Sequence, residues 1–77
     1  MIIDEIMALT GRNRHMSSLL AVRYLVKDTS HTYDQVSEIT GIKRGPLFAL
    51  WLYADDMMTV KNFLTDYKTV RAHFKSQ

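Results

Sequence analysis

The stretch of sequence that decides the fold is Val36-Ser37-Glu38-Ile39-Thr40-Gly41-Ile42. It predicts a tight corner between two helices. Ser37 is a small residue where the two helices cross closely, and Gly41, four positions later, supplies the positive φ that ends the first helix. Ile42 then fills the corner, and Leu47 follows at helical spacing to face the same core. The pattern describes packing, so the function has to be inferred from the exposed residues around it.

The length of 77 residues predicts a single domain over residues 1–77. A core of this size is only marginally stable, so we expect a homodimer that buries more apolar surface. The chain has no cysteine, which leaves neither a disulfide nor a thiolate metal site. The first residues lack the basic start of a signal peptide, and no apolar run approaches the roughly 20 residues of a membrane span. We therefore expect a soluble, cytoplasmic protein with no membrane partner.

Charge is distributed unevenly along the chain, whose formal net charge is +2. Residues 1–40 carry four basic and five acidic residues, a balance of −1, whereas residues 41–77 carry six basic and three acidic residues, a balance of +3. A basic second half favours contact with phosphates, although dedicated DNA-binding proteins concentrate more charge on one face.

Hydrophobic spacing predicts an all-α fold, a compact bundle of about five helices without strand-like alternation. The first helix covers residues 2–10 and ends at Gly11. The second begins near Asn13, a good N-cap, and is apolar almost all round, which is typical of a central buried helix. Thr32 and Gln35 form a capping box that opens a short third helix, running to about Thr40.

The fourth helix is expected to start with Pro46 at its first position, where the missing N–H group costs nothing. Asp55 or Asp56 then caps a longer C-terminal helix over about residues 56–75. Its apolar residues recur at a 3-4-3-4 spacing, which is typical of a packed seam. We expect this seam to lie either in the core or at a homodimer interface formed by Met57, Val60, Leu64 and Tyr67. In the third helix, Val36 and Ile39 are expected to face inward.

From about residue 21 to residue 50, the chain resembles the helix-turn-helix regions of small bacterial and phage DNA-binding regulators. An apolar helix ending in Arg23-Tyr24-Leu25 and the glycine-centred turn at about residues 41–45 carry the resemblance. It implies that residues 33–40 lie across the DNA backbone and that the following helix enters the major groove of double-stranded DNA.

The resemblance also implies DNA-binding roles for four side chains. By position, Tyr33 meets a phosphate, while Lys43, Arg44 and Phe48 face the groove. The family usually has serine or threonine at the position of Lys43, where it caps the recognition helix. The resemblance therefore suggests a small transcriptional regulator that acts as a homodimer.

The chemistry of the fourth helix leaves a second function open. Only Arg44 offers the two-pronged donor that reads a base edge, and apolar side chains discriminate poorly between bases. Phe48, Trp51 and Leu52 instead suit a protein interface, where aromatic residues contribute most of the binding energy. The alternative is a protein-interaction module that binds and modulates a larger host or cognate protein through this apolar patch.

No pattern in the chain indicates catalysis. The three histidines, His15, His31 and His73, lie on different segments without the paired spacing of metal ligands. No nucleophile, base or glycine-rich phosphate loop accompanies them. We therefore expect no enzymatic activity, metal or cofactor. The basic end of the chain, from Lys68 to Lys75, is attributed to the preference of cations for helix C-termini, with phosphate contact as the lesser alternative.

Overall fold

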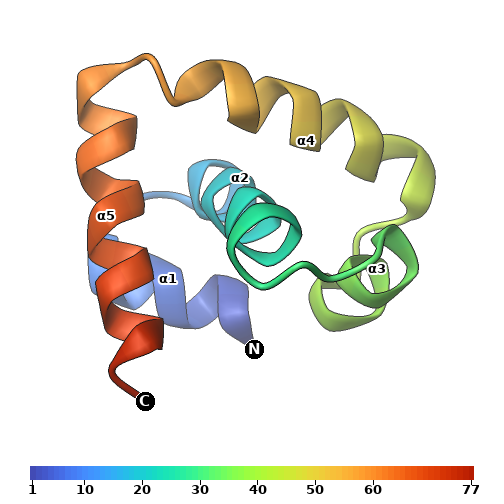
Figure 1. The fold of residues 1–77 in the computed structure, drawn as a ribbon, viewed down its shortest axis with the longest axis horizontal. Coiled ribbons are helices and arrows are strands. Elements are labelled where there is room, and N and C mark those ends of the chain that lie inside the picture. Colours follow the sequence, from blue (N-terminus) through green and yellow to red (C-terminus); the bar gives the residue numbers. More distant parts are fainter.

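A computed structural model describes all 77 residues, and it confirms an all-α fold. Five α-helices and one π-helical turn follow each other along the chain (Figure 1). Their bounds are α1 Ile2–Thr10, α2 Arg14–Arg23, η1 Tyr24–Asp28, α3 Tyr33–Thr40, α4 Arg44–Met57 and α5 Lys61–Lys75. None of these helices is both long enough and apolar enough to cross a lipid bilayer.

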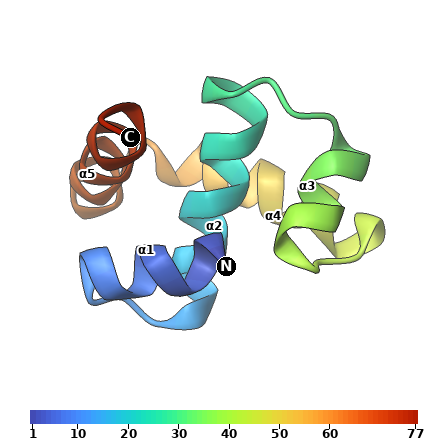
Figure 2. The same cartoon turned by 90° about the horizontal axis from the view of Figure 1, so that it is seen from below.

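Helix α2 lies at the centre of the molecule, as its apolar composition predicts. Leu19, Leu20, Ala21 and Val22 have no exposed surface at all. Figures 1 and 2 show α2 enclosed by the other helices, with α5 on one side and α3 on the opposite side. A helix that is apolar almost all round needs cover on several faces, and this arrangement supplies it.

The predicted helix boundaries near the first half of the chain are confirmed in detail. Gly11 has a φ of 72° after α1, and the Asn13 side chain accepts a hydrogen bond of 2.8 Å from the Met16 N–H group. Before α3, Thr32 and Gln35 exchange hydrogen bonds of 3.2 and 2.9 Å in the predicted capping box. These boundaries depend on partners no more than four residues away, so the sequence specifies them directly.

Two details of the second and third helices differ from the predictions. After α2 the helix widens into the π turn η1, with hydrogen bonds between residues five apart, instead of continuing as α-helix. In α3, Val36 is fully buried but Ile39 is 37% exposed. Thr40 takes the inward position one turn after Val36. Its buried hydroxyl donates a hydrogen bond of 2.7 Å to the Val36 carbonyl, so burial leaves no unpaired polar group there. The prediction that Ile39 faces inward is therefore wrong.

The junction between the last two helices also differs from its prediction. Helix α4 continues to Met57, and α5 begins only at Lys61, with Val60 as an N-cap that makes no side-chain hydrogen bond. Neither aspartate caps a helix, because buried Ala54 and half-buried Met57 extend the inward face of α4 past them. At the other end of α4, Lys43 is the N-cap, so Pro46 takes the third helical position instead of the first.

The buried side of α5 consists of Phe63, Tyr67 and Val70, which are 2%, 0% and 0% exposed. Tyr67 therefore lies in the core of a single chain, which is the first of the two places expected for the seam, and not at a homodimer interface. Leu64 and Tyr67 are neighbours on the helix, so the spacing alone does not say which of them is buried; the side that is covered is the one that packs against α1, α2 and η1. Leu64 itself is half-buried at the edge of this face.

Candidate functional site

The corner between α3 and α4 is a turn of three residues, 41–43, built around Gly41. Gly41 has a φ of 76°, as predicted, and its N–H group donates to the Ser37 carbonyl at 2.8 Å. The Ser37 hydroxyl donates to the Ile42 carbonyl at 2.6 Å, which holds the turn against the end of α3. Ile42 is half-buried against the core, and Leu47, the first inward residue of α4, is fully buried. The turn therefore fixes how α4 leaves α3.

The first turn of α4 presents two exposed cations, Lys43 and Arg44. No side chain caps this end of the helix, and its first turn contains no acid. The free N–H groups and the helix dipole therefore add to the positive charge of the side chains. The guanidinium of Arg44 lies 3.1 Å from the Asp34 carboxylate, and both side chains are largely in water, 61% and 77% exposed.

Tyr33 and Phe48 meet across the corner. Their rings pack edge to face with centroids 6.0 Å apart, although the two residues belong to different helices. Tyr33 is half-buried, while half of the surface of Phe48 remains exposed. The four residues expected to contact DNA, Tyr33, Lys43, Arg44 and Phe48, thus come from one end of the α3–α4 unit.

The outward side of α4 is apolar for most of its length. Phe48, Leu52 and Tyr53 are 50%, 49% and 50% exposed. Trp51, by contrast, is half-buried against the core, and the ammonium of Lys27 lies 5.8 Å from the centre of its ring. We call Phe48, Leu52 and Tyr53 the α4 apolar strip. It retains two of the three predicted protein-contact residues and replaces Trp51 with Tyr53.

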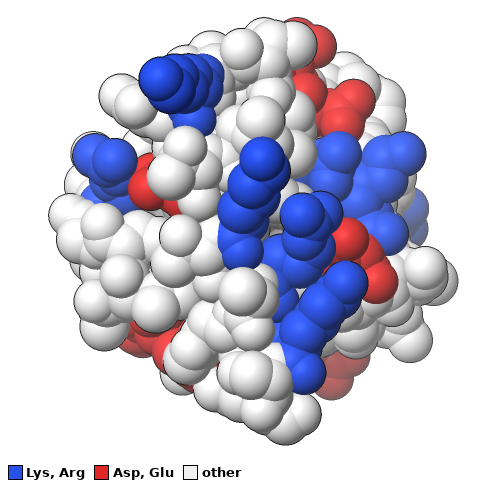
Figure 3. Space-filling model, turned by 60° about the vertical axis from the view of Figure 1, so that its left-hand side comes forward, with Lys and Arg blue, Asp and Glu red and all other residues white.

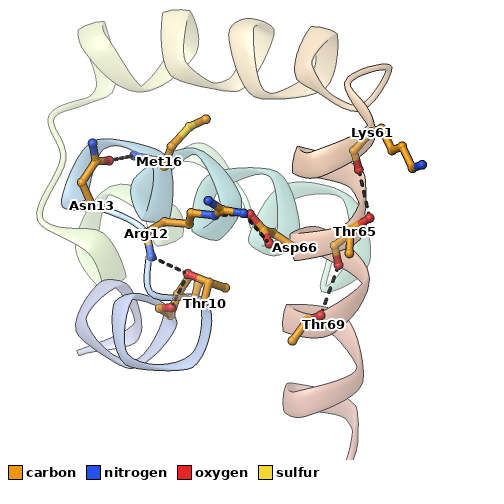
Figure 4. A network of polar contacts seen from close by, with 9 residues as sticks. Thr10, Arg12, Asn13, Met16, Lys61, Thr65, Asp66 and Thr69 are labelled. Carbon is orange, nitrogen blue, oxygen red and sulfur yellow. Dashed lines mark hydrogen bonds and ion pairs between the residues drawn. The ribbon is translucent and has the colours of Figure 1, made fainter.

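The other predicted interface residues belong to the end of α4, to the junction after it and to α5. Met57 and the 44% exposed Val60 line a shallow groove of about 480 Å³ between the α1–α2 loop, the end of α4 and α5. Figure 4 shows its polar rim, where the Arg12 guanidinium binds the Asp66 carboxylate at 2.7 Å. This hydrogen bond raises the pKa of Arg12, so the guanidinium stays charged. The two charged residues that line the groove, Arg12 and Asp66, are thus paired with each other.

Buried Tyr67 anchors α5 through a polar network that the sequence did not reveal. Its hydroxyl donates to the Asp28 carboxylate in η1 and accepts from the Arg23 guanidinium at 3.0 Å. Arg23 also binds Asp55 of α4 at 3.1 Å. Burial, reinforced by the hydrogen bond to Asp28, raises the pKa of Tyr67 well above its ordinary value. The network ties α2, η1, α4 and α5 together.

The histidines lie apart in the structure. His15 stacks on Tyr53 with ring centroids 6.5 Å apart, while His73 binds Glu5 at 2.8 Å and so joins α5 to α1. No group of three or more histidine, aspartate or glutamate side chains is placed to hold a metal ion.

Sequence reasoning missed the partners of the charged residues. The Arg44–Asp34 and Arg23–Asp55 pairs join residues 10 and 32 positions apart, and no local spacing rule connects such positions. Asp55 was assigned to a cap because aspartate favours N-caps, and that preference was the only signal available.

No protein-family model, curated protein or solved structure matches the chain. The assignment of a function therefore depends on the residues themselves.

Proposed function

We propose that this protein is a small DNA-binding regulator that docks through the α3–turn–α4 unit. One observation carries the proposal: a three-residue turn around Gly41 joins α3 to α4 and leaves Lys43 and Arg44 exposed at the uncapped start of α4. In helix-turn-helix proteins the second helix of such a unit reads base edges with residues near its N-terminus.

Arg44 has the chemistry that this role requires. Its guanidinium can donate two parallel hydrogen bonds to guanine O6 and N7, or bind a phosphate. In the free protein it is paired with Asp34, but both side chains are more than half exposed. An ion pair of this kind contributes about 0–1 kcal/mol, so Arg44 can exchange Asp34 for a DNA partner at little cost.

Tyr33 and Phe48 complete the proposed surface. Because the two rings pack on each other, Phe48 is held in a fixed orientation beside Arg44. An exposed phenylalanine in the major groove contacts thymine methyl groups, which adds a preference for A·T pairs next to the Arg44 contact. Lys43 adds a phosphate contact at the same end of the helix.

The proposal is tested with a duplex selected from a random library and a titration followed by fluorescence anisotropy. Affinity should fall by orders of magnitude between about 50 and 200 mM salt if several phosphates are contacted. Arg44→Ala should weaken binding by about 5- to 150-fold, the effect of losing 1–3 kcal/mol at a guanine contact.

Arg14→Ala is the matched control. Arg14 is also 61% exposed and is paired with an exposed aspartate, Asp4, at 2.7 Å, but it lies in α2. An equal loss in both variants would show that only net charge matters. Binding that is absent or insensitive to salt would contradict the proposal outright.

The α4 apolar strip supports a second candidate function, a module that binds a larger protein. Three half-exposed large side chains on one helix are a typical hot-spot composition when they include aromatic rings. Under this hypothesis, Phe48→Ser combined with Leu52→Ser removes partner binding while the helical circular dichroism spectrum is retained.

Val60→Ser is the control for this second candidate, because Val60 is 44% exposed but lies outside the strip. A partner captured equally well by the double variant would exclude the α4 apolar strip. Arg44→Ala distinguishes the two candidate functions, because it should weaken binding of duplex DNA far more than binding of a protein partner.

A further inference from the structure

The side of α5 that faces solvent carries a row of lysines. Lys61, Lys68 and Lys75 recur every seven residues, so on a helix they lie in one line about 10.5 Å apart. All three are exposed, and they stand opposite the buried residues Phe63 and Val70. Arg71 lies beside the row and is half-buried. We call Lys61, Lys68 and Lys75 the lysine row.

No acidic side chain neutralises the lysine row. The single acid of α5, Asp66, is bound to Arg12 of the loop between α1 and α2. Four arginines of the chain take part in ion pairs, whereas none of the lysine row or Arg71 does. Figure 3, which brings the α5 side forward, shows basic side chains across this face, with acidic side chains among them at two places and others at its borders. The unpaired positive charge of the molecule is therefore concentrated on α5.

The position of Lys61 indicates that the row is suited to an anion. Lys61 is the first residue of α5, where the helix dipole is positive and a cation is unfavourable. The N-cap, Val60, supplies no side-chain acceptor to the free N–H groups of this turn. A phosphate at this end would be attracted by Lys61 and by the helix end together.

The neighbours of the row favour a nucleic-acid backbone over a lipid surface. Exposed residues between the lysines are small or polar, and α5 exposes no large apolar side chain that would enter a membrane interface. Thr65 and Thr69 donate their hydroxyl protons to carbonyls of α5 itself, at 3.0 and 3.2 Å (Figure 4). Recognition would therefore depend on the ammonium groups, which carry no sequence information.

We propose that the lysine row is a second, sequence-independent binding surface for the phosphate backbone of duplex DNA. The spacing of about 10.5 Å is close to the major-groove width of about 12 Å, so neighbouring lysines can reach phosphates on both sides of one groove. Helices α3 and α5 lie on opposite sides of α2 (Figures 1 and 2), so this surface acts separately from Arg44. The ligand class is the same as in the proposed function, but binding at the lysine row does not depend on the α4 contact.

The test is the salt dependence of binding to a mixed-sequence duplex, measured by fluorescence anisotropy on the full chain. Replacing all three lysines of the row by glutamine should lower the slope of log K against log salt by about 2.7, at 0.9 for each lost phosphate contact. The ratio of the binding constant of the wild type to that of this variant then falls about 40-fold between about 50 and 200 mM salt. Replacing the three lysines by arginine should preserve the slope.

Three results separate this inference from the proposed function. If Arg44→Ala weakens binding but the glutamine variant keeps the wild-type slope, the lysine row is refuted and the α4 contact stands. If only the glutamine variant loses slope, the row stands and α4 docking fails. Binding of wild type to vesicles containing phosphatidylserine, without duplex binding, would overturn both by assigning the row to lipid headgroups. Circular dichroism of each variant confirms that the exposed replacements leave the fold intact.

Discussion

Removing a single oxygen atom from Tyr67 should measurably destabilise the fold. Tyr67→Phe deletes the hydroxyl that joins Asp28 to Arg23, while the ring keeps its volume and its contact with the guanidinium, which lies 5.1 Å from the ring centre. Hydrogen bonds to charged groups contribute about 1.5–3 kcal/mol each. Asp28 is exposed and regains water, and Arg23 keeps Asp55, so we expect a loss of about 2 kcal/mol in total.

Urea unfolding followed by circular dichroism measures this loss directly. For a domain of this size, 2 kcal/mol corresponds to a decrease in Tm of about 10 °C. Tyr53→Phe is the matched control, because Tyr53 is 50% exposed and should change the free energy of unfolding by less than about 0.5 kcal/mol. Equal stability of Tyr67→Phe and the wild type would refute the view that the network anchors α5.

The same network predicts an alkaline transition. Burial and Asp28 raise the pKa of Tyr67 in the folded state, whereas an unfolded tyrosine ionises near its ordinary value of about 10. Stability is therefore complete below about pH 10 and falls as the pH rises above it, because only the unfolded chain readily loses the proton. Tyr67→Phe should show a shallower loss of stability above pH 10.

Further substitutions test the local structure. Gly41→Ala should cost about 1–2 kcal/mol because of the positive φ alone, since an added Cβ there meets no neighbour; equal stability of this variant and the wild type in urea unfolding would contradict this. Ser17→Ala should leave stability unchanged or raise it by up to about 1 kcal/mol, since its buried hydroxyl has no hydrogen-bond partner; a clear loss would reveal one. The hydrogen bond from His73 lowers the pKa of Glu5, so its stabilisation is present above pH 4.5 and disappears as the pH falls through the lowered value. The difference in urea midpoint between wild type and Glu5→Gln should shrink in acid, and a constant difference from pH 7 to 3 would refute the contribution of ionised Glu5.

The candidate site was predicted only in part from the sequence. The Gly41 turn and the exposure of Lys43, Arg44 and Phe48 follow from residue types and helical spacing. The pairing of Arg44 with Asp34 and the burial of Trp51 do not, because each depends on which helices happen to lie next to α4.

The amino-acid sequence by itself determined the helical class, the central place of α2 and the boundaries made by Gly11, Asn13, the Thr32–Gln35 box and Gly41. All of these arise from interactions within about one helical turn, so neighbouring residues are sufficient to specify them.

Only the tertiary structure decided where α4 ends, which side of α5 is buried and which acids the arginines bind. The helix ends and buried sides depend on which apolar residues find a packing partner in another helix. The ion pairs join residues 10 to 54 positions apart in the sequence. Both the burial of Tyr67 and the exposure of the lysine row follow from the side on which α5 meets α1, α2 and η1.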